Sequence, residues 1–357
     1  MKPFVFKHHE KLKAKGFTKE IAEWEDGMRT DGKKGSYEWW YMDGKFEDGT
    51  TINVNFFTKL SVAINQELNP IIEVTLSKLD GTTRTISRHY KPEDFQSSKE
   101  TCNVNIAGNT WIGNLKDYTI SFSDKEENIE LKIKMKSISE SWRCAGSGDG
   151  LANFGDTGRY IGWLIAVPQG TIEAEITENG KTEIKKGTCY HDHNWGNYPM
   201  QDMFNHWYWC RTEMGPYAII SAHLCLTKEY NLTEYDEIML AKDGKIIMQN
   251  PECQKLWRST PHPQNLTGKL VSDEIRYEYI EDGNGFQLTL SKKSNIRDKF
   301  MIPDEKAREE ASKLGYNMGY HRLTGKAELK MIENGQFTKT YTNDAAVWEM
   351  MSFHDPE

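Results

Sequence analysis

The densest group of proton-transfer side chains in this chain is the run YHDHNWG, which ends at Gly196. Successive side chains of a β-strand point to opposite faces, so on a strand His191 and His193 would share one face. The other face would carry Tyr190, Asp192 and Asn194. A carboxyl group beside a phenol and an amide is suited to moving a proton.

Three interpretations of this run are open. In the first, His191 and His193 bind a metal ion, which requires a further ligand. In the second, the histidines are structural and orient a neighbour through hydrogen bonds. In the third, Asp192 is an acid in an aromatic cavity. The candidates for a further metal ligand are His206, His223 and Glu213.

The third interpretation has a direct physical basis. A carboxyl group surrounded by Trp and Tyr side chains loses hydration, so its pKa rises and it stays protonated nearer neutrality. Aromatic faces also stabilise a cation formed by protonation. Asp192 in such a cavity could therefore protonate an alkene. The alternative is that Asp192 caps a turn or pairs with Arg211.

The elements that must position this run are β-strands. Six Asp-Gly or Asn-Gly turns separate runs of strand-like sequence, for example Asp48-Gly49 and Asn334-Gly335. These dipeptides supply the positive φ that tight hairpins need. Residues 129–136 alternate apolar and charged side chains, as a half-buried strand does. The sequence predicts an all-β antiparallel fold closed into barrels or sandwiches, with one helix at Pro303–Leu314.

The length of 357 residues suggests two domains. We expect an N-terminal arm at residues 1–30, a β-domain at 31–200 and a second at 201–357. A weak internal repeat supports two related domains, because Trp39-Trp40-Tyr41 and Trp207-Tyr208-Trp209 are each followed by a turn and then by Thr-Lys. Chance similarity of two aromatic hairpins is the alternative.

Composition narrows the class of protein. The net charge of −8 is well mixed and contains no basic block, so we expect no nucleic-acid partner. No apolar run approaches the ~20 residues of a membrane span, and the first residues do not look like a secretion signal. The six cysteines form no C-x-x-C pair, so we expect reduced thiols and a cytoplasmic protein. The Gly-Ser-Gly run at 146–148 lacks a following helix and is expected to be a loop over a pocket rather than a phosphate site.

Two long motifs, YEWWYMDG at residues 37–44 and YHDHNWG at residues 190–196, resemble the hydroxyneurosporene synthase (carotenoid 1,2-hydratase) family. That family includes AttH-like lipocalin-type proteins and lipocalin-like Diels–Alderases. The run WYWCR at residues 207–211 adds a third similar segment. The resemblance implies two lipocalin-like (calycin) antiparallel β-domains, a pocket for a hydrophobic small molecule and no organic cofactor, and it disfavours a metal site at the two histidines.

The resemblance also implies roles for single residues. Asp192 matches the proton donor of the hydratases, Tyr190 matches its partner, and Trp163 matches an upstream strand Trp. We expect Asp192, Tyr190 and His193 to be catalytic. The residues expected to bind substrate are Glu38, Trp40, Trp163, His191, Asn194, Trp195, Trp207, Trp209 and Arg211.

Three functions remain open at this point. The leading hypothesis is a cofactor-independent hydratase of an isolated C=C bond in a prenyl, terpenoid or polyene substrate. In it, Asp192 forms a cation that Trp163, Tyr190, and Trp40 or Trp209 stabilise, and His193 or Asn194 guides water. The same acid could serve cyclisation, isomerisation or dehydration. The alternatives are a pericyclase of the Diels–Alderase type and a non-catalytic binder of an apolar ligand.

Overall fold

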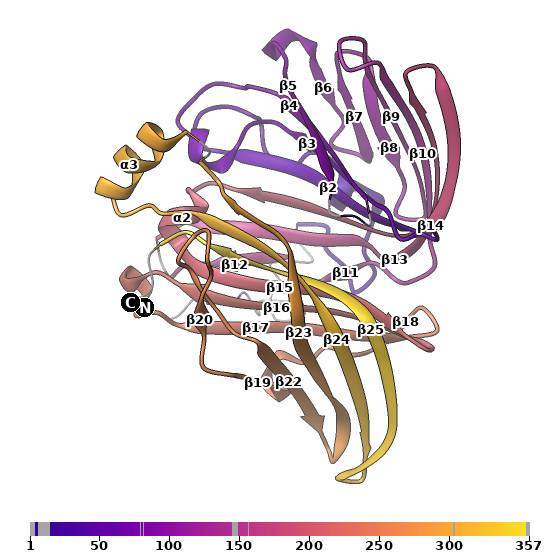
Figure 1. The fold of residues 1–357 in the computed structure, drawn as a ribbon, viewed down its shortest axis with the longest axis vertical. Coiled ribbons are helices and arrows are strands. Elements are labelled where there is room, and N and C mark those ends of the chain that lie inside the picture. Colours follow the sequence, from indigo (N-terminus) through magenta and orange to yellow (C-terminus); the bar gives the residue numbers. More distant parts are fainter. Residues whose placement is uncertain are drawn as a thin grey trace. The chain divides into compact units, whose positions relative to one another are not determined.

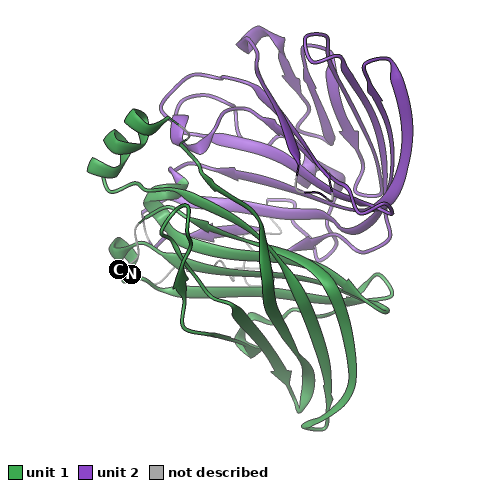
Figure 2. Cartoon of the chain, in the orientation of Figure 1, with its two compact units in different colours: residues 1–2, 200–357 green, residues 3–199 purple. Residues whose placement is uncertain are grey.

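A computed structural model of the protein describes residues 4–5, 15–78, 80, 82–144, 149–155, 157–302 and 304–354. The chain forms two compact units (Figure 2), residues 3–199 (the N-terminal unit) and residues 200–357 (the C-terminal unit). Three expectations from the sequence lie outside the described residues. They are the Gly-Ser-Gly run at 146–148, Gly81 of the predicted Asp80-Gly81 turn (one of the six) and the helix start at Pro303.

The N-terminal unit is one curved antiparallel sheet (Figure 1). Its main path runs β5-β4-β3-β2-β14-β13-β10-β9-β8-β7-β6, and β1, β11 and β12 pair beside it. The strands are β1 (Phe4–Val5), β2 (Tyr37–Phe46), β3 (Thr51–Phe57), β4 (Ile71–Ser77), β5 (Thr83–His89), β6 (Phe95–Ser97), β7 (Cys102–Ile106), β8 (Asn109–Gly113), β9 (Asp117–Asp124), β10 (Ile129–Ser137), β11 (Trp142–Arg143), β12 (Leu151–Asn153), β13 (Tyr160–Glu178) and β14 (Lys181–Gly196). Short 3-10 turns are η1 (Glu23–Asp26), η2 (Ser61–Ala63) and η3 (Pro92–Asp94).

The C-terminal unit is a second antiparallel sheet, with the order β18-β17-β16-β15-β25-β24-β23-β22-β19 and a separate pair β20-β21. Its strands are β15 (Phe204–Met214), β16 (Tyr217–Leu226), β17 (Glu234–Lys242), β18 (Lys245–Met248), β19 (Gln254–Arg258), β20 (His262–Pro263), β21 (Leu270–Val271), β22 (Glu274–Glu281), β23 (Asn284–Phe300), β24 (Gly319–Glu333) and β25 (Gln336–Ser352). Its helical segments are α2 (Met200–Met203), η4 (Lys228–Tyr230), η5 (Pro251–Cys253) and α3 (Glu305–Lys313).

The hairpin turns confirm the prediction from sequence. Gly49 has a φ of 80°, and four further Asn-Gly or Asp-Gly turns have positive φ at both residues. Positive φ at both central residues gives the turn a backbone twist that matches the twist of the two antiparallel strands it connects. The four are Asn179-Gly180, Asp243-Gly244, Asp282-Gly283 and Asn334-Gly335. The predicted helix is confirmed as α3, which Asp304 caps by accepting from the backbone N–H of Ala307.

Each sheet buries one face against its own hydrophobic cluster. On β10, Ile129, Leu131, Ile133 and Met135 are buried while the residues between them are exposed, as predicted. The N-terminal cluster includes Trp40 and Trp111, and the C-terminal cluster includes Tyr208 and Trp348. The face of each sheet that packs into its cluster is called the inward face below, and the opposite face the outward face.

The two units share one strand order. In each, the first long strand starts a run of hairpins, β2-β3-β4-β5 or β15-β16-β17-β18, and also pairs with the last strand, β14 or β25. Trp40 on β2 and Tyr208 on β15 both point inward, with partly exposed aromatics on either side. This shared order is what the internal repeat predicts, because equal positions of the aromatic motif occupy equal places in the two sheets.

All six cysteines lie among the described residues, and none forms a disulfide. The fold is nearly all-β, as the sequence predicts. Among the described residues, no helix is long and apolar enough to cross a membrane.

Candidate active site

The run at residues 190–196 lies in the second half of β14, at the centre of the N-terminal sheet. Strand β14 pairs with β2 on one side and β13 on the other. Its first half is largely exposed, but every residue from Cys189 to Gly196 is buried. Ordinary half-buried strands alternate, so this segment is covered on both faces. His191, His193 and Asp192 are therefore all buried, and burying such a polar side chain without a hydrogen-bond partner would cost free energy.

On the outward face, three neutral donors surround the carboxylate of Asp192. The indole Nε1 of Trp163 and the hydroxyl of Tyr190 each donate to Oδ2 at 2.8 Å. The side-chain Nδ2 of Asn194 donates to Oδ1 at 2.8 Å. Asp192 keeps 6% of its surface exposed.

Burial raises the pKa of Asp192, and the donors Trp163, Tyr190 and Asn194 together with nearby His191 offset only part of that effect. Burial likewise raises the pKa of Tyr190 well above its ordinary value, and the neighbouring carboxyl of Asp192 adds to this. Tyr190 is therefore a neutral hydroxyl. A raised pKa populates the acid form of Asp192, while the donors stabilise the carboxylate that remains once the proton has left. Both properties are those of a general acid.

Strand β13 places Trp163 beside Asp192, and the register between β13 and β14 is irregular next to this point. Trp163 pairs with Asn194 and Ile165 with Asp192, and the pairing then slips between Ile165 and Val167. A second slip follows before Gly170, across Pro168, which has no backbone N–H to donate. Bulges of this kind re-aim side chains beside functional sites.

Further aromatic rings extend the outward face around Asp192. Trp142 packs edge-on against Trp163 with ring centroids 5.8 Å apart. Tyr41, which pairs with Asp192 across the strands, lies 6.2 Å from Tyr190. The hydroxyl of Tyr41 accepts from Nδ2 of Asn53 at 3.0 Å. The acid therefore lies in a predominantly aromatic wall.

The histidines of the motif point inward, away from Asp192. Nδ1 of His191 lies 2.9 Å from the carbonyl oxygen of Tyr41, so it donates, and Nε2 lies 3.2 Å from Oδ2 of Asp26. Tyr118 donates to the same Oδ2 at 2.6 Å. Burial alone would raise the pKa of Asp26, but His191, His193 and Tyr118 outweigh it and lower that pKa. Burial lowers the pKa of His191, but the carboxylate of Asp26 raises it by more, so the pKa of His191 is raised overall. This is a buried ion pair.

His193 belongs to a second buried pair. Its Nε2 lies 2.7 Å from Oε1 of Glu38, and its ring stacks on Trp40 with centroids 4.6 Å apart. Glu38 also accepts from the backbone N–H groups of Arg29 and Thr30 and from the Thr30 hydroxyl. Four donors thus satisfy a carboxylate with no exposed surface.

Asp26, Cys102 and His191 offer ligand atoms that lie within 4.8 Å of one another, the arrangement nearest to a metal site among the described residues. Structural zinc sites use four such ligands. Here Oδ2 of Asp26 already accepts from His191 and Tyr118, so hydrogen bonds account for the cluster. The candidate ligands His206, His223 and Glu213 belong to the C-terminal unit.

Trp195 also lies on the inward face, 5.0 Å from the ring of His193. Gly162 pairs with it on β13, and a Cβ on Gly162 would lie 2.1 Å from Cε2 of the indole. The missing side chain at residue 162 is what makes room for Trp195. Of the residues expected at the site, the structure therefore groups Tyr190, Asn194 and Trp163 with Asp192. It places Glu38, Trp40, His191, His193 and Trp195 on the opposite face.

Trp207, Trp209 and Arg211 lie on the outward face of β15 in the C-terminal unit, because Tyr208 and Cys210 between them point into the core. Trp207 packs against Phe204 and Phe353, with centroids 5.7 and 5.0 Å away. Their role in binding substrate remains a prediction.

Several residues of the cluster were not found from the sequence. Asp26 and Thr30 come from the segment expected to be an arm, and nothing in its local pattern marks them as partners of His191 and Glu38. In the C-terminal unit, Glu349 on β25 pairs with Trp209 as Asp192 pairs with Tyr41 in the N-terminal unit, and the hydroxyl of Tyr320 donates to Glu349 at 2.7 Å. The internal repeat is the signal that could have found Glu349.

Two solved structures share this architecture. CghA bound to Sch210972 aligns with a TM-score of 0.61 and 13% identity, over 90% of this chain and 88% of that chain. Kievitone hydratase from Nectria haematococca aligns with a TM-score of 0.58 and 11% identity, over 94% of this chain and 93% of that chain. At these identities the similarity shows the fold, which is lipocalin-like as predicted.

A curated relative is hydroxyneurosporene dehydrogenase from Chlorobaculum tepidum, 24% identical over 206 residues. The match covers 50% of this chain and 54% of the relative, so the chain spans about half the length of the curated relative it matches. A family model described as Diels-Alderase-like matches residues 32–319, which include both long motifs. The chain therefore belongs to the Diels-Alderase-like family, one of the groups that its motifs resemble.

Proposed function

We propose that the protein is an enzyme that protonates an isolated C=C bond of a prenyl, terpenoid or polyene substrate, with Asp192 as the acid and water as the final nucleophile. The observation that carries this proposal is the state of Asp192. It is a buried carboxyl with a raised pKa, held by three neutral donors on an aromatic face. The solved structure of a hydratase with the same fold is consistent with it.

In the proposed reaction, the O–H proton of Asp192 passes to one alkene carbon, and the π electrons form the new C–H bond. The other carbon becomes a cation. A water oxygen then bonds to it and returns a proton to the Asp192 carboxylate, so the acid is regenerated and the net change is addition of water. Cyclisation, isomerisation and dehydration pass through a similar cation and differ in how it is quenched.

The geometry redistributes the roles expected from sequence. Trp40 and His193 lie on the inward face, so the rings that can face a cation near Asp192 are those of Trp163 and Tyr41. The side-chain carbonyl of Asn194, whose Nδ2 is held by Asp192, is the group that can hold the incoming water.

The second candidate is a pericyclase, which the Diels-Alderase-like family match favours. In that case the aromatic wall shapes a polyene, and Asp192 tunes the reaction without transferring a proton. A non-catalytic binder of an apolar ligand is the third candidate, and it would return every substrate unchanged.

Labelled water separates these candidates. The purified protein is incubated with lycopene, geraniol and a linear polyketide triene carrying a dienophile, in D₂O and in H₂¹⁸O. The proposal expects a product with deuterium on carbon, and hydration adds ¹⁸O as well. Asp192→Asn should abolish turnover with the fold intact, while Asp124→Asn, a buried carboxylate bound to Arg88, should retain it. Unlabelled cycloadduct, or full activity of Asp192→Asn, would contradict the proposal.

A further inference from the structure

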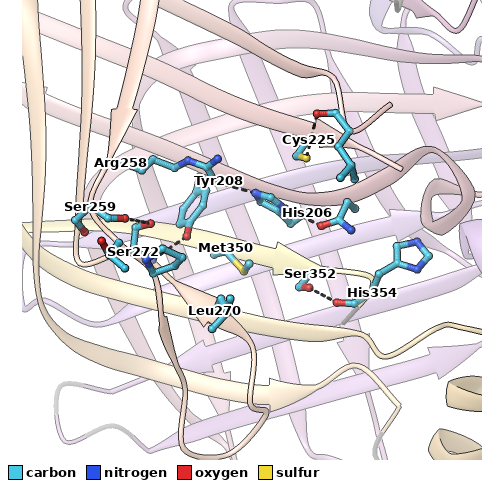
Figure 3. Close-up of a pocket in the computed structure, with 14 residues that line it drawn as sticks. His206, Tyr208, Cys225, Arg258, Ser259, Leu270, Ser272, Met350, Ser352 and His354 are labelled. Carbon is cyan, nitrogen blue, oxygen red and sulfur yellow. Dashed lines mark hydrogen bonds between the residues drawn. The ribbon is translucent and has the colours of Figure 1, made fainter. Parts of the chain in front are cut away.

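The inward face of the C-terminal unit contains a pocket that is separate from the Asp192 cluster. It has a volume of about 440 Å³ and is lined by residues of this unit. Small-molecule sites occupy about 300–1,000 Å³. Figure 3 shows Arg258, His206 and Tyr208 along one wall, with Ser259 and Ser272 at one end and Ser352 and His354 at the other.

The shared strand order explains why this place is hollow. Glu38 lies two residues before Trp40, and His206 lies two residues before Tyr208, so the two positions are equivalent. In the N-terminal unit, residues 25–30 fill the space beside Glu38 and satisfy it with Arg29 and Thr30. In the C-terminal unit, His206 instead borders the pocket.

The pocket wall offers hydrogen-bond donors. The guanidinium of Arg258 donates to Nε2 of His206 at 3.0 Å and to Glu234. Arginine carries five N–H groups, so three have no acceptor among the described residues. Tyr208 also lines the pocket, and its hydroxyl oxygen accepts from the backbone N–H of Ser272 at 3.0 Å, which leaves the O–H group as a donor for a ligand.

The acceptor His206 carries no charge of its own. Burial, together with Arg258 and His223, lowers the pKa of His206 to about 3. Arg258 can only donate, so Nε2 of His206 accepts and Nδ1 donates to Asn205 at 2.9 Å. His206 thus orients the guanidinium without neutralising it. Glu234, whose side chain is 49% exposed, is the carboxylate that pairs with Arg258. His223 lies nearby, with Nδ1 2.7 Å from Asp236 and Nε2 3.7 Å from Glu234.

The lining also includes four apolar residues, Leu232, Pro261, Leu270 and Met350. We propose that this pocket is a second binding site that takes a small aliphatic monocarboxylic acid, with the carboxylate on Arg258 and Tyr208 and the chain against these apolar residues. A ligand carboxylate would occupy here the role that the carboxylate of Glu38 has in the other unit. This site is independent of the alkene chemistry proposed for Asp192.

Calorimetric titration of the full chain with octanoate and with octan-1-ol tests the proposal. The wild type should bind octanoate about tenfold more tightly than the alcohol, because a carboxylate accepts stronger hydrogen bonds from Arg. Arg258→Met should weaken octanoate about tenfold and leave octan-1-ol within about twofold. Glu234→Gln should tighten octanoate about threefold, since it removes the competing carboxylate.

Leu270→Trp, which fills the pocket, should abolish binding of both probes. Leu314→Trp is its matched control, because Leu314 is 73% exposed on the surface, and it should bind both normally. The Glu234→Gln variant keeps the test decisive if Arg258→Met fails to fold. Octanoate that does not saturate, or that binds Leu270→Trp and Glu234→Gln as it binds the wild type, would overturn the proposal.

Discussion

The indole nitrogen of Trp163 donates a hydrogen bond to the carboxylate of Asp192 at 2.8 Å, across neighbouring strands and beside a slip in their register. This contact joins the indole ring of Trp163 to the acid, beside the hydrogen bond from Tyr190. It holds the carboxylate in place and stabilises its charged form, so it affects both the position and the pKa of Asp192.

Trp163→Phe should therefore change the proposed catalysis in two ways. Loss of a hydrogen bond to a charged group costs about 1.5–3 kcal/mol, so kcat/KM should fall by about 10- to 100-fold. The pKa of Asp192 should rise further, because one of the groups that lowers it is gone. Trp142→Phe is the control, since Trp142 packs edge-on against the Trp163 ring, while the groups named above as lowering the pKa of Asp192 are Trp163, Tyr190, Asn194 and His191. An unchanged rate and pH profile in Trp163→Phe would exclude a role for this contact.

The acid form of Asp192 sets the pH dependence of the reaction. Because the pKa of Asp192 is raised from 3.8, the protonated fraction, and with it turnover, should fall as the pH rises through the raised value. The effect on stability has the same sign. The folded state binds this proton more tightly than the unfolded chain, so stability decreases as the pH rises from about 3.8 to the folded pKa. Stopped assays between pH 4 and pH 9 measure the first effect, and a rate that rises with pH would contradict it.

Asp26→Asn should destabilise the N-terminal unit by about 3–5 kcal/mol, because it leaves the buried His191 without its counter-charge. The loss is measured by urea unfolding at neutral pH. Asp31→Asn provides the comparison, since the Asp31 side chain is 55% exposed and its ion pair with Lys33 is on the surface. Equal stability of both variants would mean that the buried pair makes no net contribution.

The same pair should give stability a defined pH window. The pKa of His191 is raised, so its contribution is complete below 6.5 and is lost as the pH rises through the folded value. The pKa of Asp26 is lowered, so its contribution is complete above 3.8 and is lost as the pH falls through the folded value. The contribution of this pair to the free energy of unfolding should therefore fall on both sides of a plateau, in addition to the decline that Asp192 causes above about pH 3.8. In His191→Asn the alkaline decline should disappear, and its persistence would assign it to another group.

Gly162→Ala should destabilise the protein by about 1–3 kcal/mol, because the added Cβ overlaps the Trp195 ring. Trp195→Leu in the same background should recover part of that loss, since a smaller side chain makes room for the methyl group. Thermal unfolding of the two single variants and the double variant measures the coupling. Strictly additive effects would show that the two positions do not compete for space.

Local sequence was enough to predict the strands and turns. Alternation in residues 129–136 and dipeptides such as Asn179-Gly180 act within a few residues, through side-chain period and backbone sterics. The two faces of the run at 190–196 followed from the same period. The aromatic repeat predicted the shared strand order. Similar sequences at the start of each unit, Trp39-Trp40-Tyr41 and Trp207-Tyr208-Trp209, tend to form similar hairpins.

Partners distant in sequence depended on the tertiary structure. His191 meets Asp26 across 165 residues and Asp192 meets Trp163 across 29, and no local pattern encodes either distance. The register of β2 against β14 decided that Trp40 points away from Asp192, since a shift of one residue exchanges the faces. The sequence by itself determined which residues could carry chemistry, through their types and the strand period. Only the packing of distant strands decided which of them share a face, because burial and charge pairing depend on neighbours that the chain brings together when it folds.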